Sequence, residues 1–194
     1  MLRRHELREV RCLIASDVRA ALRYAAGFLE GNASAARKLS ILLMPGPMCC
    51  ALHRLAHWMW CKDWRFAAGL LARINYVVHK AEIAPGASIG PGMYLPHTVG
   101  VLFQGHAGRG LTLYTNCQVA PQRATPPFGE VPQDAPTLGN DVTVGAYAVV
   151  LGPAQIGDAV RIGPAAVING DLGPEMAAFS RLRPKLSAQM GASS

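Results

Sequence analysis

The second half of the chain repeats an apolar residue every six positions. The repeat occurs in two registers, first at Ile83, Ile89, Leu95, Val101, Ala107, Leu113 and Val119, and then at Leu138, Val144, Val150, Ile156, Ile162 and Ile168. An amphipathic helix would show a period of 3.6 and a strand a period of 2, whereas a six-residue period is typical of a β-helix. Small residues that follow many of these positions, such as Gly90 and Gly145, allow the chain to turn sharply. The pattern predicts a left-handed parallel β-helix over residues 81–172, with an inserted loop at 121–137.

The first eighty residues have a different pattern. Leucine and alanine recur there at spacings of three and four, which predicts helices near 3–30, 35–43, 47–60 and 63–79. All three tryptophans lie in this part, and we interpret them as packing in the core or between subunits. The predicted fold class is therefore α+β: a helical N-terminal domain (1–80), the β-helix (81–172) and a C-terminal tail (173–194).

Composition narrows the class of protein. The chain is 51% hydrophobic and 16% charged, which excludes intrinsic disorder. Its five cysteines follow no metal-binding or disulfide spacing, so we expect reduced thiols and a cytoplasmic location. We find no signal peptide, and the most apolar stretch, 41–52, is too short to span a bilayer. His53 and His57 lie four residues apart on one helix, but without the glutamate of a zinc-protease motif we expect no metal.

The formal net charge of +7 suggests an anionic partner. We expect no nucleic acid, because the basic residues are scattered and no nucleic-acid motif is present. A polyphosphate cofactor, an acidic carrier protein or simply a solvated basic surface would each account for this charge.

Several segments resemble one enzyme family. They are Asp17-Val18-Arg19-Ala20, the run from Leu52 to Trp58, the run from Glu82 to Gly90, His97-Thr98-Val99-Gly100-Val101, and the run from Pro136 to Ala146. Together they resemble the short form of the serine acetyltransferases, within the hexapeptide-repeat acyltransferase superfamily. The resemblance covers most of residues 17–172. It implies transfer of an acetyl group from acetyl-CoA, or another acyl-CoA, to a hydroxyl, with no metal.

The resemblance also implies catalytic residues. His97 matches the histidine of the family, and Glu82 matches the carboxylate that orients it. A hydroxyl is a weak nucleophile near neutral pH, so a base with a pKa near neutrality must accept its proton as it attacks the thioester. A carboxylate fixes the histidine tautomer and stabilises the imidazolium. Fifteen residues separate the two, slightly less than one coil of about eighteen, so they should lie on neighbouring coils.

The acceptor side departs from the family. Pro96 stands where the family has aspartate, Asp134-Ala135-Pro136 stands where it has Arg-His-Pro, and its acidic residue of the helical domain falls near Asn32 and Ala33. The loop after Pro121 is long and proline-rich and also carries Phe128. We therefore expect an acceptor other than free serine, because a zwitterion needs charged partners. The candidate acceptor-binding residues are Pro96, Arg123 and Asp134.

The donor side matches better. In the family, the pantetheine arm of CoA lies between neighbouring β-helices of a trimer and bonds largely to main chain. The matching positions are Gly145, Ala146, Arg161, Gly163 and Pro164. In the tail, basic residues at 181, 183 and 185 could contact the CoA phosphates or could simply be solvated.

The main hypothesis is thus an acyl-CoA-dependent acyltransferase acting on a hydroxyl or amine of a small molecule. Three alternatives stay open: a carrier-protein-dependent acyltransferase of a specialised biosynthetic pathway, an orthodox serine O-acetyltransferase of cysteine biosynthesis, and an inactive structural subunit. The resemblance implies a homotrimer, which could pair into a dimer of trimers. An acyl carrier protein is a conceivable partner, and we expect no membrane association.

Overall fold

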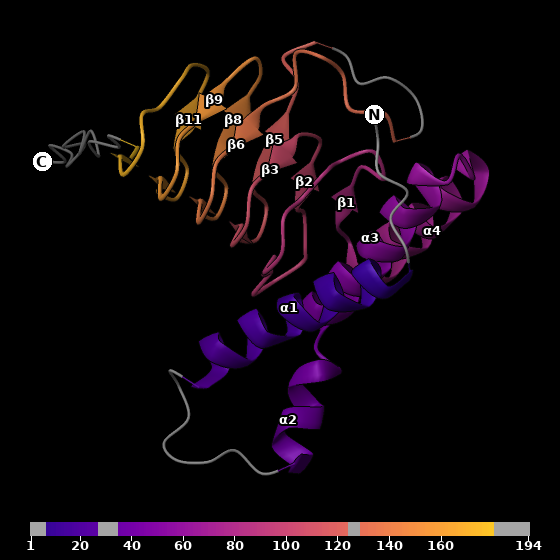
Figure 1. Cartoon of the computed structure of the whole chain (residues 1–194). Coiled ribbons are helices and arrows are strands. Elements are labelled where there is room, and N and C mark those ends of the chain that lie inside the picture. The colour runs from indigo at the N-terminus through magenta and orange to yellow at the C-terminus, as the bar shows by residue number, and fades with distance from the viewer. Residues whose placement is uncertain (1–6, 27–34, 124–128, 181–194) are drawn as a thin grey trace, which may run out of the picture.

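The helices at 45–61 and 65–79 lie beside the first coil of the β-helix, the helix at 35–42 lies apart from the coils, and the later coils project away from the first (Figure 1). The computed structural model describes residues 7–26, 35–123 and 129–180. The four predicted helices are confirmed as α1 (Leu7–Ala26), α2 (Ala35–Leu42), α3 (Pro45–Cys61) and α4 (Arg65–His79). Pro45 begins α3, because proline has no N–H to lose in a first turn. Lys80 ends α4 in a left-handed conformation.

The second half forms three parallel sheets, which are the three faces of a left-handed β-helix, as predicted. Face 1 contains β1 (Glu82–Ile83), β2 (Leu102–Phe103), β5 (Gln118–Ala120), β8 (Val149–Leu151) and β11 (Val167–Ile168). Face 2 contains β3 (His106–Ala107), β6 (Thr137–Leu138) and β9 (Gln155–Ile156). Face 3 contains β4 (Thr112–Leu113), β7 (Thr143–Val144), β10 (Arg161–Ile162) and β12 (Ala177–Ala178).

The six-residue repeat marks the core correctly. Eleven of its thirteen residues are buried, and the other two, Ala107 and Ile168, are partly buried against the same core. Stacking apolar side chains coil upon coil gives this fold a continuous interior.

The coils are less regular than the repeat suggests. Glu82 pairs with Leu102, a coil of twenty residues, and Leu102 pairs with Gln118, a coil of sixteen. The two extra residues lie in the turn that contains His97, so Phe103 rather than Val101 stands opposite Ile83. The coils also continue past residue 172, because a final coil of sixteen residues lets Ala177 pair with Arg161 after the six-residue spacing has ended.

A buried ion pair joins the helices to the β-helix. Arg54 on α3 donates to Asp17 on α1 at 2.8 Å, and both residues are 2% exposed. Asp17 also accepts the backbone N–H groups of Gly92 and Met93, while Arg54 donates to the carbonyls of Ile89 and Gly90. Both residues belong to the segments that carry the family resemblance. They fix α1 and α3 against the coil that bears His97.

Two further expectations concern the cysteines and the membrane. All five cysteines are free thiols, as predicted. In the part of the chain that the structure describes, no helix combines the length and apolarity that crossing a bilayer would require.

Candidate active site

His97 lies on the long turn that links face 3 to face 1. Its side chain is exposed, as is that of Val99, whereas Thr98 between them is buried. The next coil holds the turn in place: the hydroxyl of Thr115 donates to the Val99 carbonyl at 2.8 Å, and the Asn116 N–H donates to the same oxygen at 2.9 Å. The turn thus presents the imidazole on the outside of the β-helix on a fixed backbone.

Glu82 begins the first coil, the coil that ends with the His97 turn. Its backbone N–H donates to the Val101 carbonyl at 2.8 Å, and its side chain is exposed on face 1. Among the described residues, no hydrogen bond or ion pair joins the side chains of Glu82 and His97. The fold therefore places Glu82 beside the end of the His97 turn, within one coil of twenty residues, and does not bond the two side chains to each other.

The predicted donor positions share the edge on which His97 lies. Their turns stack on its turn, because Tyr147 donates its N–H to the Thr115 carbonyl and Ala165 donates its N–H to the Ala146 carbonyl. We call this stack of turns (96–100, 114–117, 145–148 and 163–166) the His97 edge.

The glycines on this edge are closely packed. A side chain at Gly145 would meet the Ile162 carbonyl at 2.7 Å, and one at Gly163 would meet the ring of Phe179 at 2.5 Å. Pro164 is exposed at its turn, and Arg161 is exposed on face 3 two residues before Gly163. Phe179, which the sequence did not single out, therefore covers part of the predicted donor site.

The predicted acceptor residues divide between two edges. Pro96 is next to His97, whereas Arg123 and Asp134 belong to the loop between face 1 and face 2. This loop lies over the first coil, where Gly86 donates its N–H to the Gly129 carbonyl at 2.8 Å. Arg123 is exposed and Asp134 is half-buried. Within one protomer, therefore, the loop lies at a different edge from His97.

Some predicted positions lie outside the described residues. These are Asn32 and Ala33, Phe128 in the loop, and the basic residues of the tail at 181, 183 and 185.

Three tyrosines that the sequence analysis passed over gather at face 3, where the chain enters the His97 edge. Tyr94 is on face 3, bridged to Thr112. Tyr24 at the end of α1 stacks on Tyr94 with ring centroids 4.2 Å apart, and its hydroxyl is 3.4 Å from that of Thr112. Burial first, and then Tyr114 and Tyr24, raise the pKa of the Tyr94 phenol. The only signal in the sequence was that Tyr94 and Tyr114 directly flank repeat residues, where side chains point outward.

The other histidines that the structure describes do not form a metal site. His53 is 1% exposed with no hydrogen-bond partner for either ring nitrogen, and burial lowers its pKa well below the ordinary value. His57, with its ring centroid 6.0 Å away, bonds through Nδ1 to the Pro85 carbonyl. His106 on face 2 accepts the Ser88 N–H. Within the described ranges, no three histidine, cysteine, aspartate or glutamate side chains meet as a metal site requires.

Known proteins agree with this architecture. The family model "Bacterial transferase hexapeptide (six repeats)" matches residues 135–170. A serine acetyltransferase of Helicobacter pylori is 36% identical over 147 residues, which is 74% of this chain and 83% of that protein.

Solved structures match over more of the chain. Serine acetyltransferase isoform 3 of Entamoeba histolytica, solved with cysteine, has a TM-score of 0.75 at 24% identity, covering 95% of this chain. The soybean enzyme complexed with serine has the same TM-score and identity over 89% of this chain. The chain spans 62% of the first of these structures and 68% of the second. At this identity, the two structures support the fold alone.

The relative from Helicobacter pylori is similar over most of its own length, and its likeness includes both the helical part and the β-helix. The chain therefore belongs to the serine acetyltransferase family of hexapeptide-repeat acyltransferases.

Proposed function

We propose that this protein transfers an acyl group from acyl-CoA to a hydroxyl or amine of a small acceptor, with His97 as the general base. The observation that carries the proposal is the His97 edge. An exposed histidine lies there on the same edge as the turns of Gly145 and Gly163, where the family resemblance expects the pantetheine arm of CoA. A base so placed can accept the acceptor's proton while the nucleophile attacks the thioester carbon and CoA leaves as its thiol.

The acceptor in this proposal is not free serine. Pro96 beside His97 and Ala135 in the loop, which is 6% exposed, carry no charge. A charged group that is left without a partner in a closed site costs free energy on binding. Orthodox serine acetylation is the second candidate, and the names of the relatives favour it.

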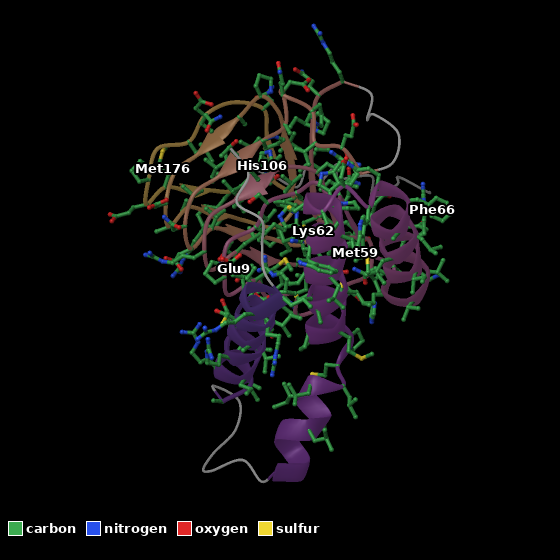
Figure 2. The ribbon with its side chains drawn as sticks, turned by 45° about the vertical axis from the view of Figure 1, so that its right-hand side comes forward. Glu9, Met59, Lys62, Phe66, His106 and Met176 are labelled. Carbon is green, nitrogen blue, oxygen red and sulfur yellow. The ribbon has the colours of Figure 1, made fainter. Side chains whose placement is uncertain are left out.

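A homotrimer would complete the site. Val99, Tyr147 and Val167 are 56%, 64% and 66% exposed along the His97 edge and face 1, and such apolar side chains indicate a protein contact. A second copy packed there would bring its own groups to His97, including its loop. Phe66 is 86% exposed on the outer side of α4, away from the β-helix, where two trimers could meet (Figure 2).

The test is release of CoA thiol with acetyl-CoA and a panel of alcohols and amines that includes L-serine. We expect wild-type protein to turn over at least one acceptor and His97→Ala to lose that turnover. His106→Ala, which removes a half-buried histidine from face 2, is the matched control. If no acceptor gives thiol release that depends on His97, the proposal is wrong.

A further inference from the structure

We propose that Tyr24, Tyr94 and Tyr114 form one wall of the acceptor site and select acceptors whose reactive hydroxyl or amine is attached to a planar aromatic body. The inference rests on the proposed role of His97, because it assigns the wall to the acceptor of that reaction.

The register of face 3 puts the wall next to His97. Leu95 and Leu113 are buried, so the residues on either side of each point outward, since neighbouring side chains of a strand alternate. Tyr94 therefore points outward beside Thr112, its bridge partner. Pro96 and Tyr114 occupy the next outward positions, two residues further along, as the first residues of the His97 turn and of the turn stacked on it.

Tyr24 extends this surface from a different element. It reaches face 3 from the end of α1, and its ring lies nearly parallel to that of Tyr94, with an angle of 16° between the planes. Tyr24 nevertheless stays 43% exposed, while Tyr94 and Tyr114 are half-buried. Aromatic rings that stack on each other and still face solvent can contact a third ring.

The coils that carry the tyrosines assign the wall to the acceptor site and not to the donor site. Tyr94 and Tyr114 lie on the coils of His97 and Thr115, whereas the predicted donor turns of Ala146 and Pro164 come on the next two coils. An acceptor must approach His97 from the side that the pantetheine leaves free. Pro96 adds apolar surface on that side.

Matched probes can separate stacking from simple hydrophobicity. The pair 2-phenylethanol and 2-cyclohexylethanol share the hydroxyl and differ in the planarity of the ring, and 2-phenylethylamine and 2-cyclohexylethylamine repeat the comparison with an amine. An apolar surface that offers no stacking would bind the cyclohexyl compound at least as well, because the cyclohexyl ring has more aliphatic area to bury. Stacking on the wall should favour the phenyl member by about threefold to tenfold.

Binding is measured by calorimetry on the trimer or other native assembly of His97→Ala in the presence of CoA, so that no turnover is needed. In that background, Tyr24→Leu and Tyr94→Leu should abolish the phenyl preference, and Tyr94→Phe should keep it. Tyr76→Leu is the control, because Tyr76 on α4 is 44% exposed, almost the same as Tyr24. Of the two leucine variants, Tyr24→Leu is the one less expected to disturb folding, because the ring of Tyr24 is the most exposed of the three tyrosines.

The outcomes separate the two proposals. A phenyl preference that disappears in Tyr24→Leu and Tyr94→Leu but not in Tyr76→Leu supports the wall. Equal binding of the two rings, no binding of either, or an unchanged preference in both variants would overturn it. In the wild-type protein, absence of His97-dependent thiol release would instead overturn the proposed reaction, even where the binding preference persists.

Discussion

At the scale of single residues, His53 is the histidine most changed by folding. Burial, and after it the charges of Arg54 and His57, lower the pKa of its ring well below the ordinary value. The unfolded chain protonates this ring near pH 6.5, while the folded chain does not. The contribution of neutral His53 to stability is therefore fully present above the pKa of the unfolded chain. As the pH drops through that pKa, the free energy of unfolding falls by up to about 1.4 kcal/mol per pH unit.

We predict that His53→Leu flattens this acid dependence. The measurement is the free energy of unfolding by urea at pH 7.5 and pH 5.5, in wild type and variant. His79 and His106 also have pKa values lowered by burial, but they contribute equally in both proteins, so the difference isolates His53. The same loss of stability on acidification in both proteins would contradict the prediction.

Also at this scale, His97→Ala should lower kcat for the true acceptor by about 10²–10⁴-fold, the usual contribution of a general base. Glu82→Gln should lower it less, because Glu82 acts only through the orientation of His97. Both side chains are exposed, so neither change should lower the melting temperature. Stopped-time thiol assays and thermal melts on the same samples check both points. Near-normal turnover in His97→Ala would refute the mechanism.

At the scale of elements, the Asp17–Arg54 pair determines how α1 and α3 sit on the first coil. Asp17→Asn leaves a buried guanidinium without its counter-charge, which typically costs about 3–5 kcal/mol. We expect a loss of that order in the free energy of unfolding, measured with urea. The control is Asp63→Asn, which removes the exposed partner of Arg65 and should cost less than about 1 kcal/mol. If the two changes lowered the free energy of unfolding by similar amounts, this role of the Asp17–Arg54 pair would be contradicted.

Elements also explain how far the sequence could predict the structure. The six-residue repeat predicted the β-helix because each inward position of a coil must be small and apolar. It could not predict the long His97 turn, since two added residues before Phe103 are removed again in the next coil. Nor could it predict the stacking of Tyr24 on Tyr94, because that contact joins α1 to face 3 across seventy positions. The candidate base was found only through the family resemblance, since an exposed histidine on a turn has no periodic signal.

At the scale of the whole molecule, the exposed apolar residues along the His97 edge and face 1 predict assembly. Tyr147→Asp combined with Val167→Asp should weaken a trimer, because two charges would be buried at each contact. We expect light scattering to show smaller species and the thiol assay to show reduced turnover, with helix and strand content unchanged by circular dichroism. Wild-type protein that is monomeric at micromolar concentration would contradict the assembly itself.

The identity of the acceptor also belongs to this scale, because it depends on groups from different parts of the fold and from a second copy. L-Serine needs a partner for its ammonium and another for its carboxylate, whereas Pro96 and Ala135 are uncharged. Each unmet group should cost about 1–3 kcal/mol, so serine should react with an efficiency roughly two to four powers of ten below that of the true acceptor. Pro96→Asp together with Asp134→Arg supplies one charge of each sign at positions where the family has them, and should raise kcat/KM for serine while lowering it for the best alcohol or amine. Wild-type turnover of serine in the ordinary enzyme range, about 1–10³ s⁻¹, would contradict the prediction and would assign recognition of the amino acid to Arg123 and Asp134 from the loop of a neighbouring copy.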